Sequence, residues 1–194
     1  MKILIGSDIH GDAEACRALL HTAETEGAER LVLLGDLLYH GPRNDLPPAY
    51  APKQVIDMLN RSPLRPLCVR GNCEAEVDAM VLSFPVMADY AFLEWDGIRI
   101  FATHGHLFSP EHLPPLCAGE VFLSGHTHIP MAETDAQGIL CLNPGSAALP
   151  KGGWPRSYML YENREFTVRC LEDGRVLCRA ALPPDPEKQI SSEE

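Results

Sequence analysis

The sequence has few positive charges, no long apolar run and no paired cysteine motif. Lysine and arginine number 16 against 27 aspartates and glutamates, which gives a net charge of -11. A chain this acidic lacks the basic surface that binds the phosphates of long nucleic acid, so we exclude that class of partner. No apolar stretch approaches the roughly 20 residues that span a bilayer, and we expect no membrane partner.

The seven cysteines form an odd, scattered set without a CxxC pair. Neither a disulfide framework nor a zinc knuckle is therefore indicated, and we expect mostly reduced cysteines in the core. The first residues carry one positive charge and a short apolar stretch that Asp8 ends, which differs from a signal peptide. These features together predict a cytoplasmic protein.

Strands and helices are predicted to alternate in the first half of the chain. Apolar runs over residues 2–7 and 31–34 flank an amphipathic stretch over 12–25 that Gly27 ends, which has the length and order of a βαβ unit. A proline-rich stretch over residues 39–52 is predicted to be a long surface loop. The remaining elements expected in this half are helices over residues 52–59 and 74–82 and a short strand over 67–69.

The second half consists mostly of predicted strands. Asp96-Gly97 and Asp173-Gly174 are hairpin turn signals, so the parallel sheet should become partly antiparallel. From residue 183 the composition is too polar to bury anything, which predicts one domain over residues 1–182 and a loose tail over 183–194. The expected strands cover residues 90–95, 98–103, 121–123, 139–142, 158–161, 166–171 and 176–181.

Five short polar clusters each follow an apolar run interpreted as a strand. Ligand-binding loops of open α/β sheets gather at the C-terminal edge of the strands, so clusters far apart in sequence can meet there. Five of the eight histidines occupy such positions. The clusters are Asp8-Ile9-His10, Gly35-Asp36, Gly71-Asn72-Cys73-Glu74, Thr103-His104-Gly105-His106 and Gly125-His126-Thr127-His128.

Carboxylate, imidazole and amide groups without a thiolate set suit a hard to borderline divalent metal. Alone, each cluster is better interpreted as a helix cap, a turn or a packed histidine, but together they indicate metal binding. With about four protein ligands per ion, the set is too large for one site and supplies two if Asp36 bridges. The predicted metal ligands are Asp8, His10, Asp36, Asn72, His104, His126 and His128.

In this order, the motifs Asp8-Ile9-His10, Gly35-Asp36, Gly71-Asn72, Thr103-His104-Gly105-His106 and Gly125-His126-Thr127-His128 resemble those of the calcineurin-like metallophosphoesterases. Four further segments are similar to the bacterial YfcE-type phosphodiesterases of that family, and the resemblance covers residues 1–182. They are His40-Gly41-Pro42-Arg43-Asn44, Val69-Arg70-Gly71-Asn72-Cys73, Asn143-Pro144-Gly145-Ser146 and Pro150-Lys151-Gly152-Gly153.

This resemblance implies a fold and a division of the ligands. The implied fold is a four-layer α/β/β/α sandwich of two mixed sheets flanked by helices. Two divalent ions are implied, with Mn²⁺ the expected metal and Zn²⁺, Fe²⁺ or Ni²⁺ the alternatives. A pair of cations about 4 Å apart turns a bound water into the attacking hydroxide and stabilises the entering and leaving oxygens. The implied ligand sets are Asp8, His10, Asp36 and His128 for one ion, and Asp36, Asn72, His104 and His126 for the other.

One departure from the family concerns the proton donor. Many members have a histidine directly after the Gly-Asn pair, whereas this chain has Cys73, as the YfcE-type branch does. A neutral thiol is a poor proton donor, so Cys73 is predicted to line the site, with simple packing under the loop as the alternative. The candidate catalytic residues are Asn72, Cys73 and His106, and His106 alternatively supports His104.

Two further segments carry open alternatives. Arg43 and Cys73 are the candidate substrate-binding residues, and Arg43 is equally well interpreted as an exposed loop arginine. The segment over residues 143–146 is interpreted as a tight turn only.

These features predict a metal-dependent phosphodiesterase that hydrolyses a small organic phosphodiester. A phosphomonoesterase or nucleotidase using the same site is the nearest alternative, and no residue decides between them. A non-catalytic scaffold with this fold is disfavoured, because such a protein should have lost ligands. Relatives of this branch can self-associate, so a homo-oligomer is left open.

Overall fold

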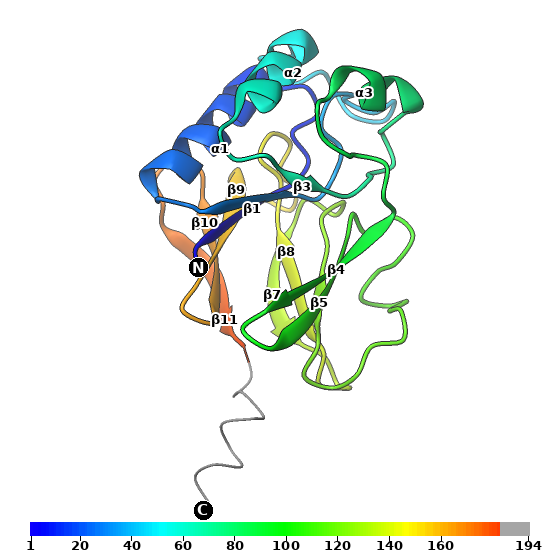
Figure 1. Ribbon diagram of the computed structural model, residues 1–194, viewed down its shortest axis with the longest axis vertical. Helices are drawn as coiled ribbons and strands as arrows, with labels where there is room; N and C mark the ends of the chain where they lie inside the picture. The colour runs from blue at the N-terminus through cyan, green and yellow to red at the C-terminus, as the bar shows by residue number, and fades with distance from the viewer. Residues whose placement is uncertain (183–194) are drawn as a thin grey trace, which may run out of the picture.

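The computed structural model describes residues 1–182, and the predicted tail over residues 183–194 lies outside them. Within the described part, two mixed sheets pack face to face (Figure 1), which confirms the predicted α/β fold class. The helices are α1 (Ala13–Thr25), α2 (Pro52–Arg61) and α3 (Glu76–Val81). The strands are β1 (Ile3–Gly6), β2 (Arg30–Leu33), β3 (Leu67–Cys68), β4 (Tyr90–Trp95), β5 (Ile98–Thr103), β6 (Val121–Leu123), β7 (Pro130–Thr134), β8 (Leu140–Pro144), β9 (Ser157–Glu162), β10 (Glu165–Cys170) and β11 (Val176–Ala181).

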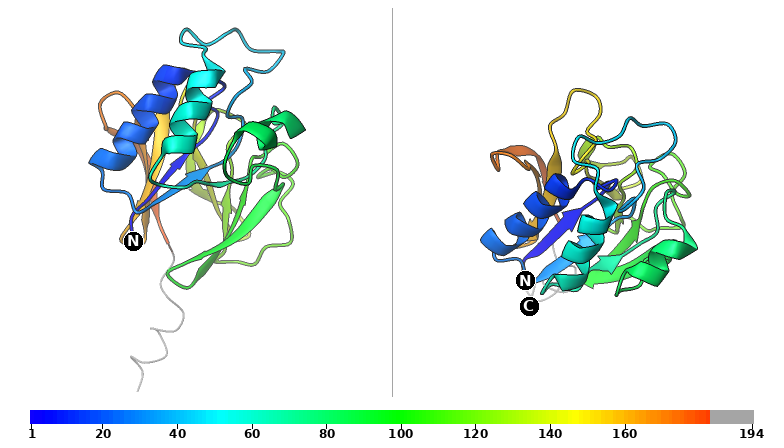
Figure 2. Two further views of the ribbon diagram at one scale, coloured as in Figure 1. Left: turned by 45° about the horizontal axis from the view of Figure 1, so that its top comes forward. Right: turned by 90° about the horizontal axis from the view of Figure 1, so that it is seen from above.

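The six-stranded sheet has the order β11-β10-β9-β1-β2-β3. Strands β1, β2 and β3 pair in parallel, as the βαβ pattern predicts, whereas β9 joins β1 antiparallel. Helices α1 and α2 cover the outer face of this sheet (Figure 2). Asp12 caps α1 through the amide of Ala15, and Leu19 of this helix packs against Leu4 and Leu33 of the sheet.

The five-stranded sheet has the order β4-β5-β6-β8-β7, with β5, β6 and β8 in parallel and β4 and β7 antiparallel at its edges. Its inner face packs against the first sheet through residues such as Ile5, Ile100 and Leu123. On its outer face, Phe122 belongs to a small third cluster that Phe108 contacts from the loop after β5. The two sheets therefore align the C-terminal ends of β1, β2, β3, β5 and β6 for one site.

Three details of the structure differ from the sequence prediction or were absent from it. Strand β7 was not expected, because it begins with a proline and is half exposed at a sheet edge, where the alternation of apolar residues is weak. Strands β9 and β10 are joined by Asn163-Arg164, and both residues have positive φ (52° and 63°), as a tight hairpin turn requires. The predicted helix over residues 74–82 begins only at Glu76.

All seven cysteines are free, and four of them are buried, in agreement with the expected reduced core residues. No helix over residues 1–182 is both long and apolar enough to cross a membrane.

One contact between the sheets ends in a hydrogen bond at the surface. The Trp95 ring of β4 lies 5.2 Å from the ring of Tyr161 in β9, measured between centroids. The buried Tyr161 donates its hydroxyl hydrogen to the carboxylate of Asp96 in the β4–β5 turn. Burial and the neighbouring Asp96 raise the pKa of Tyr161, so the hydroxyl stays protonated.

We expect Tyr161→Phe to lower the free energy of unfolding by about 1–2 kcal/mol, because the bond to a charged acceptor is lost while the ring stays. Urea denaturation measures this change, and the exposed Tyr90→Phe is the matched control. In an Asp96→Asn background the same substitution should cost less. An equal cost in both backgrounds would contradict the role given to Asp96.

Candidate metal centre

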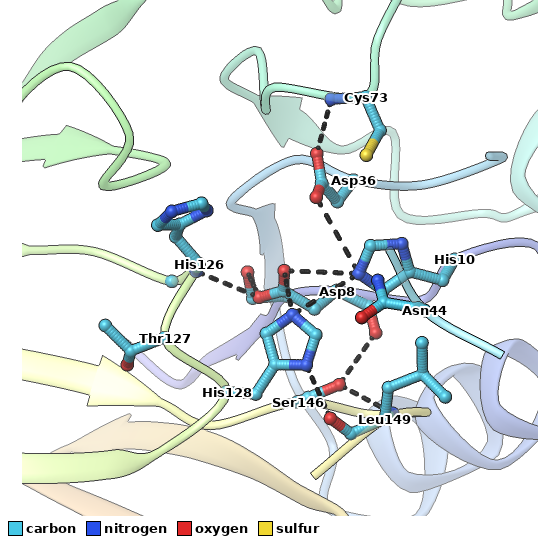
Figure 3. Close-up of polar contacts among 12 residues, drawn as sticks. Asp8, His10, Asp36, Asn44, Cys73, His126, Thr127, His128, Ser146 and Leu149 are labelled. Carbon is cyan, nitrogen blue, oxygen red and sulfur yellow. Dashed lines mark hydrogen bonds and ion pairs between the residues drawn. The ribbon is translucent and has the colours of Figure 1, made fainter. Parts of the chain in front are cut away.

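The seven predicted ligands come together at one end of the two sheets. Each lies in a loop directly after a strand: Asp8 and His10 after β1, Asp36 after β2, Asn72 after β3, His104 after β5, and His126 and His128 after β6. Three of these loops belong to the six-stranded sheet and two to the other sheet. Figure 3 shows Asp8, His10, Asp36 and His128 pointing toward one another. The convergence expected from the strand positions is therefore present.

The backbone of these loops is unusual. Eight non-glycine residues over residues 1–182 have positive φ, between 49° and 66°, and five of them are predicted ligands. Such left-handed conformations cost free energy in residues with a Cβ and persist where the surroundings impose them. The five ligands are Asp8, His10, Asp36, His126 and His128.

Asp8 is completely buried and has two different carboxylate oxygens. Its Oδ2 accepts hydrogen bonds from the Ser7 hydroxyl (2.6 Å) and from the His126 amide (3.1 Å). Its Oδ1 is buried without a hydrogen-bond partner and lies 3.1 Å from Nε2 of His128 and 3.6 Å from Nε2 of His10. Burial alone would raise the pKa of Asp8, but the surrounding imidazoles hold this pKa well below its usual value. The carboxylate is thus charged and has one oxygen free for a cation.

Three histidines are oriented by backbone carbonyls. Nδ1 of His10 donates to the carbonyl of Tyr39 (2.8 Å), and Nδ1 of His104 donates to that of Leu34 (2.7 Å). Nδ1 of His128 likewise donates to the carbonyl of Leu149. A carbonyl only accepts, so Nδ1 carries a hydrogen, and Nε2 of each ring presents a lone pair whenever the ring is neutral. This is the tautomer that a metal ligand needs.

Asp36 lies between the two groups of histidines. Its Oδ2 is 3.7 Å from Nε2 of His10 and 3.5 Å from Nε2 of His104. On the side of His104, the Asn72 amide oxygen lies 3.2 Å from Nε2 of that ring, and Nδ1 of His126 lies at the same distance from it. One oxygen of Asp36 is therefore within reach of both groups of ligands.

The donor set fits divalent metal ions. Ligand atoms of Asp8, His10 and His128 lie within 4.8 Å of one another, and so do those of Asp8, Asp36 and His104. Nε2 of His10 and Nε2 of His128, each with a lone pair when its ring is neutral, are only 3.4 Å apart. Two facing lone pairs repel unless a shared cation or proton lies between them, and the unpaired Oδ1 of Asp8 points to the same place.

Glu74 supports this centre, a role that was not predicted from the sequence. Its buried carboxylate accepts hydrogen bonds from the amides of Asp36 (2.9 Å), Leu37 (2.7 Å) and Gly71. Burial and the neighbouring Asp36 raise the pKa of Glu74, while the three amide donors oppose that rise. Glu74 thereby fixes the loop of Asp36 to the loop of Asn72. Its position next to Cys73 in a ligand cluster was the only signal available from sequence.

The segment over residues 143–146 does more than form the expected turn. The Asn143 amide donates to the carbonyl of Gly125 (2.7 Å) and to the Thr127 hydroxyl (3.1 Å), which fixes the loop of His126 and His128. The Ser146 hydroxyl donates to the carbonyl of Asp8 (2.9 Å). Both side chains are buried, so sequence alone gave no reason to separate them from ordinary turn residues.

Cys73 and Arg43 line a pocket of about 910 Å³ at the centre. The Cys73 amide donates to Oδ1 of Asp36 (2.9 Å), and ligand atoms of Cys73, Asp36 and His10 lie within 4.8 Å of one another. Burial and the neighbouring Asp36 raise the pKa of the thiol, so Cys73 is neutral at pH 7. Arg43 is exposed on the loop that forms one wall of this pocket.

His106 packs beside two predicted ligands. Its ring centroid lies 5.4 Å from that of His104 and 6.3 Å from that of His126. Its Nδ1 is buried without a hydrogen-bond partner, and burial together with His104 lowers its pKa. His106 is therefore a neutral imidazole at neutral pH, close to the ligands of the second group.

A family model described as the calcineurin-like phosphoesterase superfamily domain matches residues 1–165. The chain belongs to this superfamily. Phosphodiesterase YfcE of Escherichia coli K12 is 45% identical over 184 residues, which covers 95% of this chain and 100% of the relative. A solved structure of YfcE, a phosphoesterase from E. coli, has a TM-score of 0.91 and 44% identity, and the match covers 94% of this chain and 100% of that one.

A more distant solved structure shares the fold. Vps29 of Entamoeba histolytica, solved in complex with Zn²⁺, is 20% identical with a TM-score of 0.60, and the match covers 94% of this chain and 100% of that one. Family membership confirms the resemblance seen in the sequence and makes the chain a phosphoester hydrolase. The family implies a divalent metal, which the donor set described above fits.

We expect Glu74→Gln to weaken metal binding by about 10–100-fold, the usual effect of removing a partner that orients metal ligands. Either orientation of the new amide places an NH₂ group against a backbone N–H, so the loops of Asp36 and Asn72 should separate. Calorimetric titration of metal-free protein with Mn²⁺ measures this change in metal affinity. The control is Glu76→Gln, which alters an exposed carboxylate two residues away; equal affinities for both variants would contradict this role.

Proposed function

We propose that this chain is a phosphodiesterase that uses two divalent metal ions to hydrolyse a small organic phosphodiester. The observation that carries the proposal is the position of Asp36, whose Oδ2 lies within 3.7 Å of Nε2 of His10 and of His104. One carboxylate oxygen between two sets of ligands suits a bridge between two ions. The 45% identity to a phosphodiesterase along the whole of that relative favours a diester as substrate.

The ligands divide by position. We assign one ion to Asp8, His10, Asp36 and His128, and the other to Asp36, Asn72, His104 and His126, with Mn²⁺ as the metal. When bound, the ions supply Lewis-acid polarisation of the phosphoryl oxygens and a lower pKa for the attacking water.

The protein's own residues hold this chemistry in place. The carbonyls that accept from His10, His104 and His128 keep the imidazole rings fixed, so little reorganisation accompanies binding of the phosphoryl group. The pocket beside them carries the exposed cations Arg43 and Lys151, which suit an anionic substrate. Cys73 lines the same pocket as a neutral thiol and is assigned to contact with the substrate rather than to proton transfer.

The diester assignment is tested by comparing turnover of bis(p-nitrophenyl) phosphate and p-nitrophenyl phosphate with Mn²⁺ present. We expect a higher kcat/KM for the diester, and a preference for the monoester would establish the phosphomonoesterase alternative instead.

Cell fractionation tests the predicted cytoplasmic location.

We expect Asp36→Asn to lower kcat/KM by more than about 100-fold and to reduce bound metal from two ions per chain to one, because a neutral amide is a poor bridge between cations. Elemental analysis of reconstituted protein gives the stoichiometry, and the exposed Asp57→Asn is the control. Activity that survives both Asp36→Asn and chelation would favour the scaffold interpretation of the fold.

Cys73→Ala should change diester turnover by less than about tenfold, since loss of a general acid typically costs about 100-fold or more. The rate should also depend on the leaving-group pKa as steeply as in the unmodified protein, because the raised pKa of the thiol makes it a poor donor. A series of aryl diesters with graded leaving groups measures this slope. A steeper slope in the variant would assign proton donation to Cys73.

A further inference from the structure

One wall of the pocket at the metal centre is formed by the loop over residues 39–51, which rises beside the ends of α1 and α2 (Figure 2). Tyr39 opens this loop, lines the pocket and is 43% exposed. Its carbonyl accepts the hydrogen bond from Nδ1 of His10, so its backbone is one imidazole ring away from the candidate ion. Tyr39 therefore lies beside the position that a substrate phosphate would take.

The pocket is larger than a phosphoryl group needs. Its volume of about 910 Å³ lies near the upper end of the roughly 300–1,000 Å³ typical of sites for organic ligands. Among the described lining residues, most are small or polar, and Tyr39 is the one with a large apolar face. Apart from the imidazoles of the predicted ligands, Tyr39 is therefore the aromatic wall that the substituents of a diester would meet.

The ring of Tyr39 is held by a row of aromatic contacts. Its centroid lies 4.6 Å from that of His40 in an edge-to-face arrangement, and His40 contacts Tyr50 in the same way at 5.3 Å. Tyr50 in turn lies against Gly11, where a Cβ would collide with its ring. The row thus connects Tyr39 to the loop that carries His10.

Backbone hydrogen bonds fix the end of the same loop. The amide of Ala13 donates to the carbonyl of Ala49 (2.9 Å), and the amide of Ala51 donates to that of Gly11 (2.8 Å). Within the loop, the side-chain amide of Asn44 donates to the backbone carbonyl of His40 (2.8 Å). A wall that is ordered before a ligand arrives costs little conformational entropy on binding.

We propose that Tyr39 forms a subsite for a planar aromatic substituent of the phosphodiester, the class that includes nucleobases and aryl groups. An exposed tyrosine face stacks on such rings, and truncation of an aromatic partner typically weakens this binding by about tenfold or more. The inference rests on the proposed function for the nature of the substrate. Its test uses binding rather than turnover, so the two stand or fall separately.

Phosphonates are suitable probes because their P–C bond resists hydrolysis. We would titrate Mn²⁺-loaded protein with methylphosphonate, cyclohexylphosphonate and phenylphosphonate and measure each Kd by calorimetry. Phenylphosphonate should bind about tenfold more tightly than methylphosphonate, with cyclohexylphosphonate between them. Tyr39→Ala should remove the phenyl preference and leave the Kd of methylphosphonate unchanged, whereas Tyr39→Phe should retain both.

Tyr90→Ala is the control, since it removes a similarly exposed ring (48%) on β4. Equal weakening of all three phosphonates by Tyr39→Ala would overturn the subsite and assign Tyr39 to the support of His10. Equal Kd values for the cyclohexyl and phenyl probes, or no phenyl preference in the unmodified protein, would also overturn it. An intact phenyl preference without diester turnover would reject the proposed function alone.

Discussion

The carboxylates of Asp8 and Asp36 are buried close together, and much of the surrounding structure follows from this constraint. Anions in a poorly hydrated site are costly unless hydrogen bonds and opposite charges compensate them. When they are neutral, the nearest imidazoles donate their Nδ1 hydrogens to backbone carbonyls and offer only Nε2 lone pairs to these oxygens. A divalent cation is the group that satisfies carboxylate oxygens and imidazole nitrogens at the same time.

Close approach of the backbone makes this arrangement sterically feasible. A Cβ at Gly71 would overlap Oδ1 of Asp36, and a Cβ at Gly125 would overlap the Ser7 hydroxyl. The ligand loops can therefore meet only because glycines lie at these crossings. Glu74 then fixes one loop by accepting a hydrogen bond from the amide of Asp36, and Ser146 fixes another by donating to the carbonyl of Asp8. Contacts from outside the ligand set thus help to hold the left-handed conformations of Asp36 and Asp8.

The sequence predicted the parts of this site that depend on the order of strands and on residue type. Polar clusters after apolar runs located the ligands, because topology alone brings the C-terminal ends of parallel strands together. Glu74 was not predicted, because its role is to accept hydrogen bonds from backbone amides, and any buried residue with an acceptor oxygen could do so. Strand β7 escaped for a similar reason, since an edge strand that begins at Pro130 shows no clear alternation. The missed features depend on three-dimensional contacts that leave little pattern in sequence.

The same distinction separates the centre of the site from its wall. The metal ligands lie directly after strands, whereas the loop over residues 39–51 is connected to the centre by a few contacts, among them the Tyr39 carbonyl on His10. At Gly41 this loop approaches Cys73 so closely that a Cβ would lie 3.2 Å from Sγ. A larger side chain at position 73 would have to point away from Gly41 or displace the loop. The small thiol of Cys73 and the missing Cβ of Gly41 therefore let this loop pack closely against the loop of Asn72 at the edge of the pocket.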